Sequence, residues 1–160
     1  MIIIKKFNLK FNNDDVPLTY KLNDKDYNKS FTLGIFENSN LIFSCRLYYF
    51  NKTLQKELNI FDSSIKYELA DVFLYEMYRG KKINNIPYSK YCLNLVDNYI
   101  KTKNIKKLIL WTTNNNIKAI KRYIEIGFKI EKNKIINNYY QHIAYDKFNI
   151  DKNNVVVYRT

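Results

Sequence analysis

The chain contains few of the residues that build common metal and hydrolase sites. It has a single histidine, His142, so a zinc site or a Ser-His-Asp arrangement has almost nothing to use. Its two cysteines, Cys45 and Cys92, lie far apart and form no C-x-x-C pair. Isolated cysteines are typical of free thiols in a reducing compartment, not of a disulfide framework. We therefore expect no metal site, and a core or surface role for the histidine.

The chain also lacks a long hydrophobic run. The first residues, "MIIIKKF", form too short an apolar segment for a signal peptide, and no other stretch is long and apolar enough to span a bilayer. These absences predict a soluble cytoplasmic protein without a membrane partner.

Hydrophobic residues and positive charge are abundant. The 160 residues suit a single domain spanning 1–160, and 46% hydrophobic residues are enough to build a core. The net charge of +12 favours anionic partners such as nucleic acid, phosphorylated cofactors or acidic peptides. A general bias toward Lys, Asn, Ile and Tyr explains many of these lysines equally well, so charge alone does not select a partner.

Alternating and β-branched segments predict a sheet. The segments 31–36 and 41–50 flank "ENSN" and are expected to form a hairpin with a four-residue loop. The segment 153–160 is either one more strand or an ordered tail. The other expected strands are 2–8, 67–77, 106–113, 128–133 and 139–147.

Two segments have helical spacing. Residues 88–103 follow Pro87, which suits a first helical turn, and residues 117–126 precede Gly127, which suits a helix end. Residues 51–66 fit a short helix or a structured loop, 9–30 are irregular, and 78–87 form a basic loop. The order predicts an α/β (α+β) fold with a single mixed sheet of six to seven strands and flanking helices.

One helix carries a motif. In "NIKAIKRYIEIGF", Asn116, Ala119, Tyr123, Gly127 and Phe128 match N-x-x-A-x-x-x-Y-x-x-x-G-F without a gap. With the segment "YELADVFLYEMYRGKKI" and the element order from 31 to 147, the sequence resembles the GNAT acetyltransferases. This superfamily transfers an acyl group from acyl-CoA to an amine. The resemblance implies a GNAT-like acyl-CoA N-acyltransferase fold with acetyl-CoA as cosubstrate.

The resemblance assigns the cofactor contacts. The backbone of Val72, Phe73 and Leu74 would receive the pantetheine arm in a gap between residues 68–75 and 107–113. Asn116 would cap its helix and contact pantetheine, and Ala119 is small where the cofactor passes.

The pyrophosphate would bind the loop that follows the central strand. The family pattern there is Q/R-x-x-G-x-G/A, and this sequence departs from it because Lys82 and Asn84 stand at glycine positions. The alternative is a solvated basic turn that binds nothing. The residues assigned to the pyrophosphate are Arg79, Gly80, Lys81, Lys82, Ile83 and Asn84.

Two side chains are candidates for the chemistry. By resemblance, Tyr123 protonates the CoA thiolate; the alternative is a core aromatic. Glu68 stands where one branch of the family has a strand glutamate and is the candidate base. Its alternative is a strand residue without a catalytic role, with Asp71 and Glu76 as rivals, and many family members instead use water chains.

The expected function is transfer of an acetyl group from acetyl-CoA to a primary amine by direct attack in a ternary complex. The amine is a small molecule, a protein N-terminus or a lysine, and the pocket for it would involve residues 9–30 and 51–66. The alternatives are a non-catalytic acyl-CoA-binding domain of the same fold and, last, a basic nucleic-acid-binding domain. A monomer and a homodimer are both compatible with the sequence.

Overall fold

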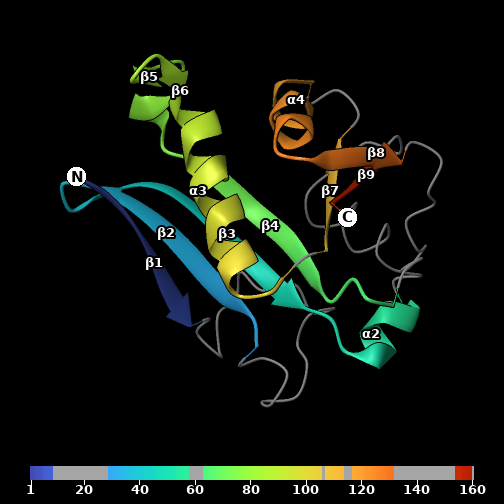
Figure 1. The fold of residues 1–160 in the computed structure, drawn as a ribbon. Helices are drawn as coiled ribbons and strands as arrows, with labels where there is room; N and C mark the ends of the chain where they lie inside the picture. Colours follow the sequence, from blue (N-terminus) through green and yellow to red (C-terminus); the bar gives the residue numbers. More distant parts are fainter. Residues whose placement is uncertain (9–28, 58–62, 106, 114–116, 132–153, 160) are drawn as a thin grey trace.

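The computed structural model describes residues 1–8, 29–57, 63–105, 107–113, 117–131 and 154–159 (Figure 1). The expected strand at 139–147, His142 and Asn116 lie outside these residues. The elements are β1 (Ile2–Asn8), β2 (Phe31–Glu37), β3 (Asn40–Tyr49), α2 (Lys52–Glu57), β4 (Tyr67–Leu74), the 3₁₀ turn η2 (Glu76–Tyr78), β5 (Lys82–Ile83), β6 (Ile86–Pro87), α3 (Tyr88–Thr102), β7 (Leu108–Thr113), α4 (Ile117–Glu125), β8 (Phe128–Glu131) and β9 (Asn154–Arg159).

Seven strands form one mixed sheet in the order β1-β2-β3-β4-β7-β9-β8. Only β4 and β7 run parallel among these neighbours; the other pairs are antiparallel. The predicted mixed central sheet of six to seven strands with flanking helices is therefore confirmed, and β5 and β6 form a separate two-stranded sheet. The segment 153–160 was compatible with a strand or an ordered tail. It forms strand β9, which inserts between β7 and β8. Its place in the sheet could not be read from its sequence because pairing partners are chosen in three dimensions.

The hairpin of β2 and β3 is tighter than expected. Glu37 and Asn40 belong to the strands and pair with each other, so the loop is Asn38–Ser39 and not four residues. Both loop residues have positive φ, 49° and 71°. Two left-handed residues form a type I′ turn, whose twist matches that of the strands, and Asn is among the residues that tolerate it best.

Strand β4 is shorter than predicted and contains a bulge. It ends at Leu74, after which η2 replaces the expected strand residues up to 77. Opposite β3, Ser44 pairs with Phe73 but Arg46 pairs with Ala70, so two β4 residues face one β3 residue. Asp71 sits in this bulge with φ of 51°. A bulge bends its strand and disrupts the ladder, which alters the course of β4 beyond this point.

The two central parallel strands meet at one place. Among the described residues, Glu68 and Ile109 are the only register pair between β4 and β7. Beyond Glu68 the two strands diverge, as the family resemblance implies for residues 68–75 and 107–113. Figure 1 shows this opening between β4 and β7, with α3 on one side of it and α4 above it. The opening leaves the backbone of the second half of β4 without a β7 partner.

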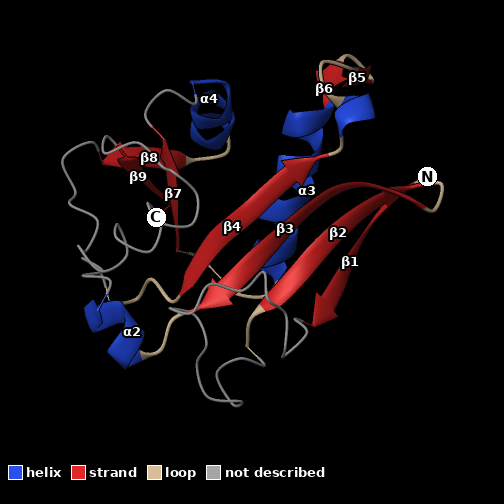
Figure 2. Cartoon of the chain, turned by 180° about the vertical axis from the view of Figure 1, so that it is seen from behind, coloured by secondary structure: helices blue, strands red, loops and turns tan. Residues whose placement is uncertain are grey.

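Helix α3 covers one face of the sheet. Its buried residues Leu93, Val96 and Ile100 pack with Leu33 and Leu47 of the sheet in the main core. Each side chain of this size contributes about 1.5–3 kcal/mol when fully buried. Figure 2 shows the opposite face of β1–β4, over which no described helix lies. Within the part of the chain that the structure describes, no helix has the length and apolar character needed to cross a membrane.

Candidate active site

A cavity of about 890 Å³ lies at the open end of β4. Strand β4, the segment that follows it, the first turn of α3 and one face of α4 form its walls. This volume is in the range of small-molecule sites. The cavity brings together most of the residues singled out in the sequence, namely Val72, Phe73, Leu74, Arg79, Gly80, Lys81, Lys82, Ala119 and Tyr123. Ile83, Asn84 and Glu68 do not line it.

The cavity wall is strongly basic. Beside Arg79, Lys81 and Lys82, helix α4 contributes three cationic residues, and no Asp or Glu is among the described lining residues. Sequence reasoning missed the set from α4. The signal was present, because positions i, i+3 and i+4 of one helix share a face. These residues are Lys118, Lys121 and Arg122.

Two of these cations are held in place. The Arg79 Nε donates a hydrogen bond to the Leu74 carbonyl at 2.8 Å, and its guanidinium lies over the Phe73 ring, 5.0 Å from the centroid. Arg122 donates to the Ser89 hydroxyl at 3.1 Å and pairs with Glu125 at 3.0 Å, which ties α4 to α3. Fixed cations lose less side-chain entropy when an anion binds.

The expected basic loop at 78–87 is in part a small hairpin. Strands β5 and β6 pair, and the turn between them is Asn84–Asn85, with φ of 49° and 64°. Asn-Asn suits this left-handed turn, so Asn84 occupies a turn position instead of reaching the cavity. The flanking residues in "KINNIP" carried the hairpin signal, but the interpretation as a continuous loop overlooked it. Gly80 has φ of 74°, a backbone conformation that favours glycine.

Tyr123 is buried on the side of α4 that faces the cavity. Its ring contacts Phe128 with 5.8 Å between centroids, and only 7% of the residue is exposed. Ala119 lies one turn earlier on the same face and also lines the cavity. Burial, with a smaller contribution from Cys45, raises the pKa of Tyr123 to about 12. The phenol therefore keeps its proton at neutral pH and is available as a donor.

Glu68 lies on the other face of the sheet. It is buried, 4% exposed, and pairs across the strands with Tyr48 and Ile109. Its neighbour Leu69 packs into the core under α3, so alternation along β4 places Glu68 on the opposite face. Tyr123 belongs to that core, hence the two candidate catalytic residues approach β4 from opposite faces.

Asp71 belongs to a polar group beside Glu68. Its Oδ2 accepts a hydrogen bond from the Tyr48 hydroxyl at 3.0 Å and one from the Arg46 guanidinium at 3.4 Å. Burial, followed by the charge of Asp71, raises the pKa of Tyr48 above its usual value. These contacts hold the bulge residue in its left-handed conformation. The other rival, Glu76, is exposed in η2.

The fold that carries this cavity resembles solved structures of other proteins. No family model and no curated protein matches the chain in sequence. The solved structures that it resembles include an IAA acetyltransferase from Bacillus cereus, with 14% identity, a TM-score of 0.60 and 99% of both chains covered. The chain has the GNAT acetyltransferase fold.

Two further structures agree with this fold. A GNAT family acetyltransferase from Elizabethkingia anophelis with acetyl-CoA bound has 17% identity and a TM-score of 0.57, covering 99% of this chain and 97% of the other. An N-acetyltransferase from Staphylococcus aureus Mu50 has 19% identity and a TM-score of 0.55 over the same shares. Identities this low establish the GNAT fold alone.

Proposed function

We propose that the chain is an N-acetyltransferase that moves an acetyl group from acetyl-CoA to a primary amine. One observation carries the proposal. A single cavity joins the half of β4 that has left its β7 partner, a wall of cations and the hydroxyl-bearing ring of Tyr123. Acetyl-CoA carries phosphates at one end, two amides in its middle and a thioester at the other end. The cations suit the phosphates, the unpaired half of β4 suits the amides and the Tyr123 hydroxyl suits the thioester sulfur.

The residues present fit such a ligand. The backbone of Val72, Phe73 and Leu74 would bind the two amides of the pantetheine arm as a short added strand. The phosphates would lie against the cations of the segment 79–82 and of α4. Asn116 is also proposed to contact the pantetheine arm. We assign Ile83 and Asn84 to shaping the hairpin that ends this segment.

Two residues of the chain would each carry out one of the two proton transfers that the reaction needs. The amine nitrogen bonds to the acetyl carbon while the carbon–sulfur bond breaks. Tyr123 would donate its proton to the leaving sulfur. Glu68 would accept the proton that the amine loses, directly or through water, and a backbone N–H near Leu74 would polarise the carbonyl. Because Tyr123 and Glu68 lie on opposite faces of β4, the thiol would leave on one face while the amine enters from the other.

The amine is a small molecule, a protein N-terminus or a lysine side chain. We place the enzyme in the cytoplasm, since Cys45 and Cys92 are buried free thiols, which suit a reducing compartment. The separation of Glu68 from the cavity favours one second candidate, a domain of the same fold that binds acyl-CoA without turning it over.

Two measurements separate these proposals. Calorimetry with acetyl-CoA should give saturable binding with a stoichiometry near one, and absence of binding contradicts both. A panel of amines should then release free CoA thiol in an amine-dependent manner. Binding without release supports the non-catalytic domain.

A further inference from the structure

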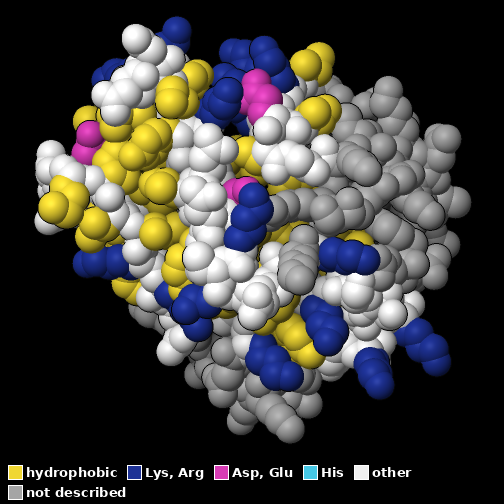
Figure 3. All heavy atoms as spheres, in the orientation of Figure 1, with side chains coloured by type: hydrophobic (Ala, Val, Ile, Leu, Met, Phe, Trp, Pro, Cys, Tyr) yellow, Lys and Arg dark blue, Asp and Glu magenta, His cyan; other side chains and the backbone are white. Residues whose placement is uncertain are grey.

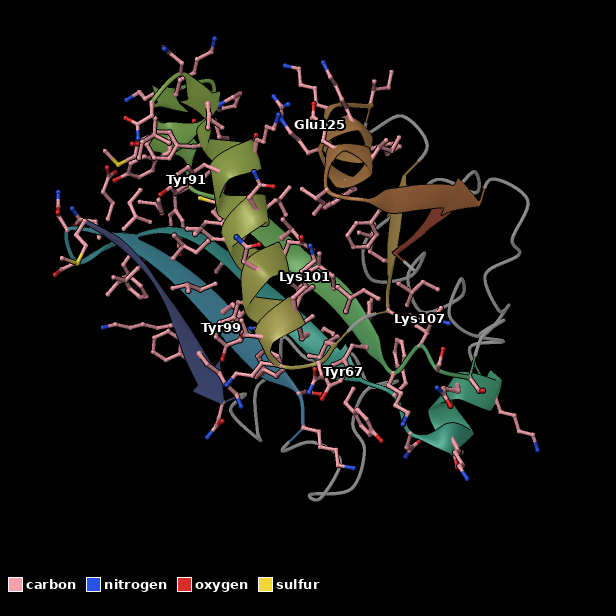
Figure 4. The ribbon with its side chains drawn as sticks, in the orientation of Figure 1. Tyr67, Tyr91, Tyr99, Lys101, Lys107 and Glu125 are labelled. Carbon is pink, nitrogen blue, oxygen red and sulfur yellow. The ribbon has the colours of Figure 1, made fainter. Side chains whose placement is uncertain are left out.

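A second cavity lies at the other end of the sheet, away from the proposed acetyl-CoA site. It has a volume of about 840 Å³ and lies where α3 ends and where β4 and β7 begin. Three of its lining residues, Tyr67, Tyr99 and Lys107, are labelled in the lower half of Figure 4. Helix α3 runs between the two cavities. Ser89 and Leu93 near its start line the proposed acetyl-CoA cavity, whereas Tyr99 near its end lines the second cavity.

Five lysines line this second cavity, and none of its described lining residues is acidic. They come from five separate places in the chain: β1, the residue pair before β2, the approach to β4, the end of α3 and the approach to β7. Figure 3 shows Lys and Arg side chains gathered on the lower part of the molecule. The tertiary fold collects these charges, since they are far apart in sequence. They are Lys6, Lys29, Lys66, Lys103 and Lys107.

Aromatic rings hold several of these ammonium groups. Lys6 lies over the Phe31 ring at 5.0 Å, and Lys103 lies over the Tyr99 ring at 5.5 Å. The two rings contact each other with 6.4 Å between centroids, and Phe31 also meets Tyr67 at 6.2 Å. Cation–π contacts of this kind orient the charge without neutralising it. These contacts therefore partly preorganise Lys6 and Lys103.

Hydroxyl and amide groups complete the wall. Ser63 and Asn104 line the same cavity and can donate hydrogen bonds to an anion. Lys6, Lys29, Lys66 and Lys103 carry like charges around one cavity and repel each other, so a bound polyanion would relieve this repulsion. A sulfate-sized ion would meet only part of the wall, whereas a chain of phosphate groups would meet several lysines together.

We propose that this cavity binds a small molecule carrying two or more phosphate groups. The volume lies within the range of small-molecule sites. The lysines converge on one concave site instead of forming the extended ridge that follows a nucleic-acid backbone. The site uses no residue of the proposed acetyl-CoA cavity, so either assignment can fail without the other.

The test uses inorganic tripolyphosphate as the probe, titrated into the full chain by calorimetry with and without saturating CoA. We expect one saturable tripolyphosphate site that persists when CoA is present. The double variant Lys66→Glu with Lys103→Glu should weaken this site at least about tenfold, because each lysine lost removes a charge-assisted contact. Both side chains are exposed, so the fold should be retained. The neutral pair Lys66→Gln with Lys103→Gln should weaken binding in the same direction.

The control is Lys5→Glu with Lys56→Glu. It lowers the net charge of +12 by the same four units at exposed lysines outside the cavity. We expect its tripolyphosphate affinity to stay within about twofold of the unmodified chain. The proposal is overturned if no saturable site remains with CoA present, or if the control weakens binding as much as the cavity variant. The proposal is also overturned, in favour of nucleic acid, if a 20-nucleotide single strand binds much more tightly than tripolyphosphate and the cavity variant abolishes that binding.

Discussion

Replacing Tyr123 by phenylalanine tests the proposed acid most directly. The substitution keeps the ring, its burial and its contact with Phe128, and removes one oxygen. We therefore expect the free energy of unfolding to change by about 1 kcal/mol or less. A proton donor to a leaving group contributes about 10²- to 10⁴-fold to the rate. Because burial raises the pKa of Tyr123 to about 12 and makes it a weaker acid, we expect the lower end, a roughly 100-fold loss in kcat.

The assay follows thiol release from acetyl-CoA with a chromogenic thiol reagent, and calorimetry follows acetyl-CoA binding on the same samples. Binding should change by less than about threefold, since the hydroxyl acts at the reacting sulfur and not at the phosphates. Tyr91→Phe is the matched control, as Tyr91 lies on α3 and does not line the cavity. A Tyr123→Phe variant with unchanged kcat refutes the reasoning. Equal losses in kcat and in binding would assign Tyr123 to packing.

Three further predictions follow from backbone and burial. Gly127→Ala should lower the free energy of unfolding by about 1–2 kcal/mol in denaturant titration, because φ is 101° at this position. Gly127→Asn should lower it less. Equal stability of the unmodified chain and both variants would contradict this prediction. Burial raises the pKa of Cys92 to about 12 and also raises the pKa of Cys45. Neither thiol should therefore react with a thiol reagent at pH 8 until the chain is unfolded. Fast labelling of the native protein would contradict this prediction. Burial also raises the pKa of Tyr123 and Tyr48 above the usual value of about 10. The stability that these protonated phenols contribute is therefore complete below pH 10 and is lost as pH rises toward 12. Phenolate absorbance at pH 10.5 should show fewer ionised tyrosines in native than in unfolded protein.

Much of the fold follows from local patterns. The helical spacing within residues 88–103 predicts a helix, and α3 forms there, with Leu93, Val96 and Ile100 on the face that the structure buries. The motif residues Ala119 and Tyr123 are one turn apart, so a shared face was expected before any tertiary contact was known. In these cases the residue period alone indicates that the segment forms a helix.

The bulge and the two asparagine turns were harder to anticipate. Asp71 has positive φ inside a strand because Tyr48 and Arg46 hold its carboxylate, and these residues lie more than 20 positions away. The sequence predicts a continuous loop at the hairpin of Asn84–Asn85, because the strands of this hairpin have only two residues each. Very short elements carry too little periodicity to be recognised in sequence.

By itself, the sequence determined the order of most of the longer helices and strands, the motif on α4 and the basic segment after β4. Only the tertiary structure decided that Glu68 and Tyr123 approach β4 from opposite faces, and that β9 inserts between β7 and β8. It also decided that Lys6, Lys66 and Lys103 share one cavity. The physical reason is that local patterns report which side of an element is buried, whereas strand pairing and helix packing bring distant residues together.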